Sequence, residues 1–254
     1  VTGREIFSVL LPDDFSFSGH SRLCRKKTED CDDPSHVVIE KGVLKQGVID
    51  AANLGKGAGL MLRDIHQKYG ENFTAEFISK VSKLGINALF INGFSAAISD
   101  TDLPEIAKQK IKQSIDEAYM IVADLIRSYE EGNLEAFPGK TLKETFELKI
   151  LEALNKARNK ASSIVSEYSS KQEDTDTIIM AKSGARGSLL QMAQIAATVG
   201  QQALRGKRVE IGFTDRTLPC FKRNDLTAPA RGFIRDGYKA GMSPPEFFFQ
   251  AMTG

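Results

Sequence analysis

A glycine-bearing turn with one arginine, Ser183-Gly184-Ala185-Arg186-Gly187-Ser188, has the residue types that bind a phosphate. Apolar residues follow at helical spacing, and we expect a helix that Ser188 and Gln191 begin as a capping box and Gly206 ends. The first N–H groups of a helix are unpaired and partly positive, and Arg186 adds a full charge. The local residues alone, however, favour the alternative, a glycine turn that only caps a buried helix.

Zinc binding is the second chemistry that the residue types allow. His20, Cys24, Cys31 and His36 carry the donor atoms of a tetrahedral zinc site, but neither pair has the close spacing of the usual structural site. The spacing favours a loop insertion without metal, and a zinc site stays open as the alternative. Cys220 stands alone and is expected to be a small buried hydrophobe.

Other catalytic signatures are missing from the sequence. His66 falls on a predicted helix, and no activated-serine turn accompanies it. Gly55, Gly57 and Gly59 lack the Lys-Ser/Thr pair of a phosphate-binding Walker loop. The basic and aromatic residues form no recognisable RNA-binding signature. Serine hydrolase, P-loop and simple RNA-binding functions are therefore not expected.

Composition sets wider bounds. The 254 residues suffice for one large or two modest domains with a core. A net charge of +1 gives no overall basic field that attracts nucleic acid, so any nucleotide contact must come from local placement. No apolar run reaches the length of a membrane span. The three cysteines, an odd number, argue against a disulfide scaffold and fit a reducing cytoplasm.

The N-terminal part is expected to mix short strands with helices. Residues Glu5 to Leu11 are mostly apolar and predict a buried strand, and the polar residues 12–36 predict a surface loop. Val37–Ile39 and Val43–Ile49 predict a β-hairpin. Helical periodicity then predicts helices over Leu60–Tyr69 and about Thr74–Leu84, and the apolar run Ile86–Phe94 is expected to be buried.

Two long helices with matching apolar stripes dominate the middle of the chain. Asp102 and Glu105 predict a capping box for the first helix, and Thr141 and Glu144 predict one for the second. The pattern therefore predicts an antiparallel helical hairpin from Asp102 to Tyr168. The stripes consist of Ile111, Ile115, Ala118, Val122, Leu125 and Tyr129, and of Phe146, Ile150, Leu154, Ala157, Ala161, Ile164 and Tyr168.

Shorter elements follow. Val209–Phe213 predicts a strand, Pro229–Tyr238 a short helix, and Ser243 begins a last helix with two prolines in its first turn. The fold class expected from all of this is mixed α/β and mainly helical: a small α/β region followed by a helical region with the long hairpin.

Several stretches resemble, in the same order, the largest subunit of multisubunit RNA polymerases. They are TGREIFSVLLP, INGFSAAISDTD, TLKETFE, LNKARNKAS, SGARGS, QMAQIAATVGQQALRGKR, VEIGFTDRTLPCF and SPPEFFFQAMTG. The likeness is to the archaeal subunit and to its counterpart in eukaryotic RNA polymerase II, and it is weakest between Ser16 and Ser35. It implies a part of an enzyme that joins ribonucleoside triphosphates onto RNA on a DNA template, with two Mg²⁺ ions at its catalytic centre.

The resemblance assigns roles to five polar side chains. A basic residue at the place of Arg186 lies near the nucleotide route and contacts the incoming triphosphate. The places of Arg158, Gln194, Gln201 and Gln202 line the pocket below the bridge helix, beside the mobile trigger loop. The residues alone would instead predict an exposed arginine and solvated amides.

The resemblance also divides the chain. Residues 1–97 resemble the part that lines the pore, 98–242 the funnel around the secondary channel, and 243–254 the start of the bridge helix. Both ends look cut, and the family's Asp-Phe-Asp-Gly-Asp run, which holds the catalytic Mg²⁺, does not occur in the chain, nor does the trigger loop. We therefore expect no catalytic residue, no resident metal or cofactor, and no polymerising activity of this chain alone.

Partners follow from the same resemblance. They are the other core subunits, a transcript-cleavage factor at the funnel, nucleoside triphosphates, and DNA and RNA in the assembled enzyme, and no membrane. The location implied is the cytoplasm with the nucleoid if the chain is archaeal, and the nucleus if it is eukaryotic. Two other functions stay open: a stand-alone phosphate-binding enzyme that uses the Arg186 turn, and a helical protein-interaction module.

Overall fold

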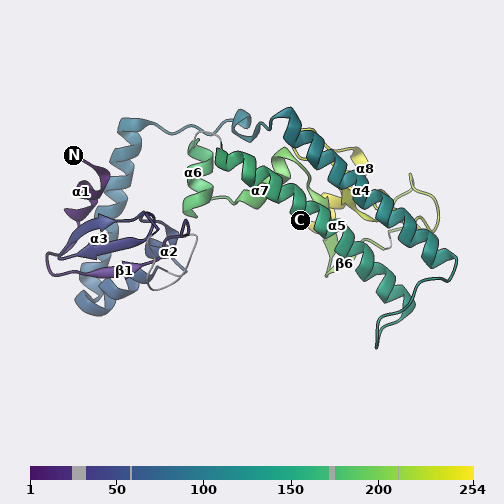
Figure 1. Ribbon diagram of the computed structural model, residues 1–254, viewed down its shortest axis with the longest axis horizontal. Coiled ribbons are helices and arrows are strands. Elements are labelled where there is room, and N and C mark those ends of the chain that lie inside the picture. The colour runs from purple at the N-terminus through teal and green to yellow at the C-terminus, as the bar shows by residue number, and fades with distance from the viewer. Residues whose placement is uncertain (25–32, 58, 172–174, 211) are drawn as a thin grey trace. The chain divides into compact units, whose positions relative to one another are not determined.

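The computed structural model describes every residue except 25–32, 58, 172–174 and 211. The chain forms two compact units, Val1–Ala97 with Asp174–Ser188, and Ile98–Glu173 with Leu189–Gly254. Long helices and small antiparallel sheets confirm the mixed α/β, mainly helical class (Figure 1). No helix in the described part of the chain combines the length and the hydrophobicity that crossing a bilayer requires.

The first unit begins with a helix, α1 (Gly3–Ser8), so the strand predicted from Glu5 to Leu11 is wrong. Local capping explains the difference. The Glu5 backbone N–H donates to the Thr2 hydroxyl at 3.4 Å, and the Thr2 N–H donates to the Glu5 carboxylate at 2.6 Å. This capping box pairs two backbone N–H groups at the start of the helix. The pattern of apolar residues, on which the strand prediction rests, contains no information about such a cap.

A three-stranded antiparallel sheet follows, in the order β1-β2-β3. Its strands are β1 (Phe17–Gly19), β2 (Val37–Glu40) and β3 (Val43–Gln46). Lys41 and Gly42 turn the chain with φ of 47° and 73°, as a two-residue hairpin turn requires, and the predicted hairpin is confirmed. The predicted loop over 12–36 is wrong where it contains β1. Gly19 pairs with Val37, so β1 ends beside the start of β2.

Further helices belong to this unit. They are α2 (Ala51–Leu54), α3 (Leu60–Asn92) and α6 (Asp176–Ser183). Gly70, with φ of 79°, interrupts α3 and separates the two helices that the sequence predicts. The predicted burial of Ile86–Phe94 is wrong, because Phe90 is 84% exposed and its apolar neighbours are also open. Hydrophobic character predicts burial only where another element of the fold covers the residues.

The second unit is built on the helical hairpin, which the sequence predicts correctly. Helices α4 (Glu105–Glu130) and α5 (Leu142–Lys171) pack against each other, as Figure 1 shows. The Thr141–Glu144 capping box is present, whereas Asp102 does not cap α4; it pairs with Lys239. The core between the helices consists of Ala107, Ile111, Ile115, Ala118, Val122, Phe146, Ile150, Leu154, Ala157, Ala161 and Val165.

The region after α5 differs most from expectation. Helix α7 covers only Leu189–Ala196, so the predicted helix as far as Gly206 is wrong. Gly200 has φ of 84°, a left-handed value that interrupts a helix, and tertiary strand pairing takes over there. The strands are β4 (Gly200–Gln201) with β7 (Phe233–Ile234), and β5 (Ala203–Leu204) with β6 (Lys207–Arg208).

The last segments confirm one prediction and correct two. Helix α8 (Pro244–Thr253) has the expected start, because Ser243 and Glu246 form a capping box. The predicted helix over 229–238 is wrong: η2 (Pro229–Arg231), a single 3-10 turn, and β7 occupy it. The predicted strand over 209–213 includes residue 211, outside the described residues, and its described residues lie outside the named strands. The 3-10 helix η1 (Ile98–Thr101) begins the unit.

Candidate functional site

The Arg186 turn is formed by the end of α6. Gly184 ends the helix in the left-handed conformation, and its N–H donates to the Ala181 carbonyl at 3.3 Å. The Arg186 N–H donates to the Met180 carbonyl at 3.4 Å, and the Arg186 side chain is exposed. Within the described residues this side chain has no hydrogen bond or ion pair, so the guanidinium is available to an anion.

A second arginine lies against the same turn. A Cβ atom placed on Gly184 would lie 1.9 Å from Arg22 Nη1, so the Arg22 guanidinium rests on the glycine. The Arg22 backbone N–H donates to the Asp50 carboxylate at 2.5 Å, which holds the backbone of Arg22 in place. The sequence gives no signal for Arg22, because only the tertiary fold brings it to the turn.

In the second unit, Arg158 lies on α5 against the start of β4. A Cβ atom on Gly200 would lie 2.9 Å from Arg158 Cδ, so the glycine leaves room for the arginine stem. Arg158 is half-buried, not exposed, and its Nη2 donates to the Asn159 side chain at 3.4 Å. Its Nε is buried without a hydrogen-bond partner among the described residues. A buried donor left unpaired costs about 1–3 kcal/mol, which marks the position as unusual.

Gln201 and Gln202 lie beside Arg158 at β4, not on a helix, and both are buried. Gln201 Nε2 donates to the Gln202 carbonyl at 2.7 Å and to the Arg231 carbonyl at 2.8 Å. Gln201 Oε1 has no partner among the described residues. Gln194 is half-buried on α7, where its carbonyl accepts from Tyr238 N–H at 3.0 Å. The fold thus gathers Arg158, Gln201 and Gln202, and the expectation of solvated amides is wrong.

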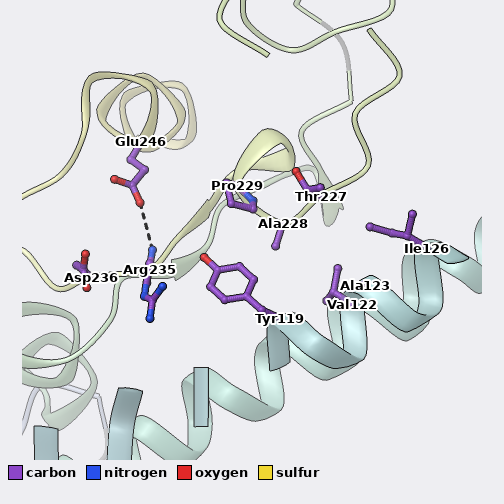
Figure 2. Close-up of a pocket in the computed structure, with 10 residues that line it drawn as sticks. All are labelled: Tyr119, Val122, Ala123, Ile126, Thr227, Ala228, Pro229, Arg235, Asp236 and Glu246. Atoms are coloured by element: carbon purple, nitrogen blue, oxygen red, sulfur yellow. Dashed lines mark hydrogen bonds between the residues drawn. The ribbon is translucent and has the colours of Figure 1, made fainter. Parts of the chain in front are cut away.

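A groove of about 570 Å³ lies between α4 and the segment before α8. Figure 2 shows Tyr119 on the α4 side and Arg235 facing it, with the Arg235 N–H donating to Glu246 of α8. Arg235 also pairs with Asp116 at 2.6 Å, and its Cζ lies 5.7 Å from the Tyr119 ring centre. Burial raises the pKa of Tyr119 to about 12, so its hydroxyl stays protonated in the alkaline range where an exposed tyrosine ionises. The sequence gives no signal for this groove.

The cysteine positions differ from expectation in one case. Cys220 is exposed, so its predicted burial is wrong. His20, Cys24 and His36 lie close together, and Cys31 lies outside the described residues.

Comparisons with known proteins show which family the chain resembles. The family description "RNA polymerase Rpb1, domain 3" matches residues 1–101, and "RNA polymerase Rpb1, domain 4" matches residues 126–234. The chain is 43% identical over its full length to DNA-directed RNA polymerase subunit Rpo1N of Methanothermobacter thermautotrophicus (strain Delta H), of which it covers 29%. It is 42% identical over its full length to the Rpo1N subunit of Methanocaldococcus jannaschii, of which it covers 19%. With the subunit of Halococcus morrhuae the identity is 44% over 86% of the chain and 62% of the relative. The chain therefore spans less than two thirds of each of these relatives.

Proposed function

The chain belongs to the family of RNA polymerase largest subunits, and we propose that it forms the pore and funnel of such an enzyme. These parts surround the secondary channel, through which nucleoside triphosphates reach the catalytic centre during DNA-templated RNA synthesis. The proposal rests on the 43% sequence identity to an Rpo1N subunit over the full length of this chain, together with matches to Rpb1 domains 3 and 4 in chain order. The same matches disfavour a stand-alone phosphate-binding enzyme and a separate helical interaction module.

Arg186 is the residue to which we assign contact with the incoming triphosphate. Its support is an exposed guanidinium without a partner among the described residues, on a turn that a second guanidinium, Arg22, also approaches. Two positive groups at one turn attract a polyphosphate more strongly than one. Arginine never loses its charge at physiological pH, so this role is electrostatic guidance and not proton transfer.

The cluster of Arg158, Gln201 and Gln202 has a different proposed role. Arg158 Nε and Gln201 Oε1 are buried and unpaired among the described residues, although such atoms ordinarily find partners. We assign these atoms, with Gln194 nearby on α7, to hydrogen bonds with the bridge helix and trigger loop of the assembled enzyme. Amides suit a moving neighbour because each offers both donors and an acceptor.

Enzyme kinetics test both assignments. In a full-length subunit assembled with its partner subunits, Arg186→Ala is expected to raise the KM for nucleoside triphosphates roughly 10-fold or more, since a charged hydrogen bond contributes about 1.5–3 kcal/mol. Arg186→Lys should raise this KM less than Arg186→Ala does, because the positive charge remains. Arg158→Ala should lower kcat with little change in KM. The matched control is Arg63→Ala, an exposed arginine on α3; equal KM values for Arg186→Ala and this control would refute the nucleotide role.

Catalysis itself we assign to groups outside this chain. The described metal-ligand cluster of His20, Cys24 and His36 offers imidazole and thiol donors, whereas Mg²⁺ takes oxygen ligands. These residues therefore do not fit the catalytic Mg²⁺ of the parent enzyme, and we expect the chain alone to make no RNA. In the assembled enzyme, the partners of this chain would be the other core subunits, DNA and RNA. Since the relatives above are archaeal, we place the enzyme in the cytoplasm with the nucleoid.

The hairpin of α4 and α5 is the part that we assign to docking of a transcript-cleavage factor. Its inner faces are packed together, so only the outer faces remain for a partner. Met120 and Ile121 on α4 are 62% and 50% exposed, which gives the outer face an apolar contact area between charged residues.

A further inference from the structure

The ends of β1 and β2 carry three side chains with metal-binding atoms. His20 directly follows β1, and His36 directly precedes β2. Because Gly19 pairs with Val37 in the antiparallel register, the two histidines extend the same end of the strand pair. Cys24 lies in the chain segment after His20. The sheet thus brings together residues whose sequence spacing gives no zinc signature.

The geometry of the three side chains is close to that of a tetrahedral site. His20 Nδ1 and His36 Nδ1 are 3.2 Å apart, and the ligand atoms of all three residues lie within 4.8 Å of one another. Zinc binds nitrogen at about 2.0–2.1 Å and sulfur at about 2.3 Å, so tetrahedral ligands are roughly 3.3–3.6 Å apart. The two nitrogens nearly have this separation, and the sulfur, which lies within 4.8 Å of them, must move closer by at most about 1.3 Å to complete the arrangement.

Neighbouring hydroxyl groups are placed to support a bound metal. Ser18 Oγ lies 2.9 Å from His36 Nε2, so it can accept a hydrogen bond from the Nε2–H of a histidine that binds metal through Nδ1. The Ser35 hydroxyl donates to the Asp33 carboxylate at 2.5 Å, its Oγ lies 3.4 Å from Cys24 Sγ, and Ser21 Oγ lies 3.7 Å from the same sulfur. The hydrogen bond to Ser18 orients the His36 ring, and the Ser21 hydroxyl can donate to Cys24 Sγ, which favours a negatively charged sulfur.

We propose that His20, Cys24 and His36 bind one zinc-class divalent ion through Nδ1, Sγ and Nδ1. Mixed imidazole and thiolate donors suit zinc and exclude a preference for Mg²⁺ or Ca²⁺. On binding, the Cys24 thiol releases its proton to solvent and both Nδ1 atoms are unprotonated. Water or another donor takes the fourth position. The ion fixes the segment that carries Arg22, whose guanidinium rests on Gly184.

Metal analysis and cobalt substitution of the full chain test this proposal. The chain expressed with zinc is expected to hold one zinc ion after desalting, by elemental mass spectrometry. Its cobalt form should show tetrahedral d–d bands and a sulfur-to-cobalt charge-transfer band. Cys24→Ser should abolish the charge-transfer band, and His36→Ala should reduce bound metal at least about 10-fold. Cys220→Ser and His66→Ala, at an exposed cysteine and an exposed histidine, should leave both signals unchanged.

Two results of the metal analysis would overturn the site, and a third comes from thermal unfolding. One is a wild-type chain that takes up cobalt without a sulfur charge-transfer band, a readout that needs no variant to fold. The other is equal zinc content in Cys24→Ser and Cys220→Ser. A chelator should lower the Tm of the wild-type chain and not that of Cys24→Ser, and an equal Tm shift in both chains would also contradict the proposal.

Discussion

Arg208 is the largest fully buried side chain among the described residues, and two strong contacts explain how a charge tolerates that position. Its Nε and Nη2 donate to the two oxygens of Glu147 at 2.8 and 2.9 Å, and Nη1 donates to the Leu226 carbonyl at 3.1 Å. The planar guanidinium matches the carboxylate in two parallel hydrogen bonds. This pair ties β6 to α5 in the second unit.

Removing one partner of this pair should be costly. Arg208→Ala leaves the Glu147 carboxylate, only 18% exposed, without its cation, and we expect a loss of about 3–5 kcal/mol in the free energy of unfolding. Urea denaturation followed by circular dichroism measures it. The matched control is Arg223→Ala, an exposed arginine for which a change within about 0.5 kcal/mol is expected. Equal stability of the two variants would show that the buried pair contributes nothing.

For single residues, the sequence indicates which side chains matter better than it predicts their burial and contacts. The resemblance singles out Arg158, Gln201 and Gln202, yet their burial becomes visible only when β4 pairs with β7. Arg22 and Arg208 escape sequence reasoning altogether. An isolated arginine gives no periodic or spacing signal, and its partners, Gly184 and Glu147, lie far away in the chain.

Elements with strong local signals are the ones that the sequence predicts correctly. The stripes of α4 and α5 recur over many turns, and the Thr141 and Ser243 capping boxes require only residues three positions apart. The helix predicted from Leu189 to Gly206 fails because β4 pairs with the distant β7, and because β5 pairs with β6, the next strand along the chain. Tertiary pairing overrides helix periodicity in so short a segment.

The hairpin supplies the prediction at the scale of elements. Met120→Glu combined with Ile121→Glu places two charges on the outer face of α4 without touching the core. In the assembled enzyme we expect the Kd for a transcript-cleavage factor to rise about 10-fold or more, as for loss of an apolar contact area at an interface. Binding measured by fluorescence anisotropy checks this.

The control for the hairpin is Ile78→Glu, which changes an exposed apolar residue of α3 in the other unit. It should leave the Kd unchanged. If the hairpin variant and this control bind the factor equally well, the outer face of α4 is not a docking surface.

At the scale of the whole molecule, the described residues include groups of exposed apolar side chains. Apolar side chains stay exposed at the end of α3 and on α8, where Phe247 and Phe248 are 55% and 57% exposed. Surfaces of this kind ordinarily contact other protein. We expect these surfaces to contact other subunits of the polymerase proposed above. The unpaired Arg158 Nε and Gln201 Oε1 fit the same explanation.

The central claim is that the turn carrying Arg186 lies on the route of nucleoside triphosphates in the assembled polymerase. Photo-crosslinking tests it most directly, with benzoylphenylalanine placed at exposed Ala185 and, as the control, at exposed Gln67 on α3. With radiolabelled nucleoside triphosphate, we predict labelling of the subunit from position 185 that excess unlabelled nucleotide suppresses. Labelling from Ala185 no stronger than from Gln67 would contradict the claim.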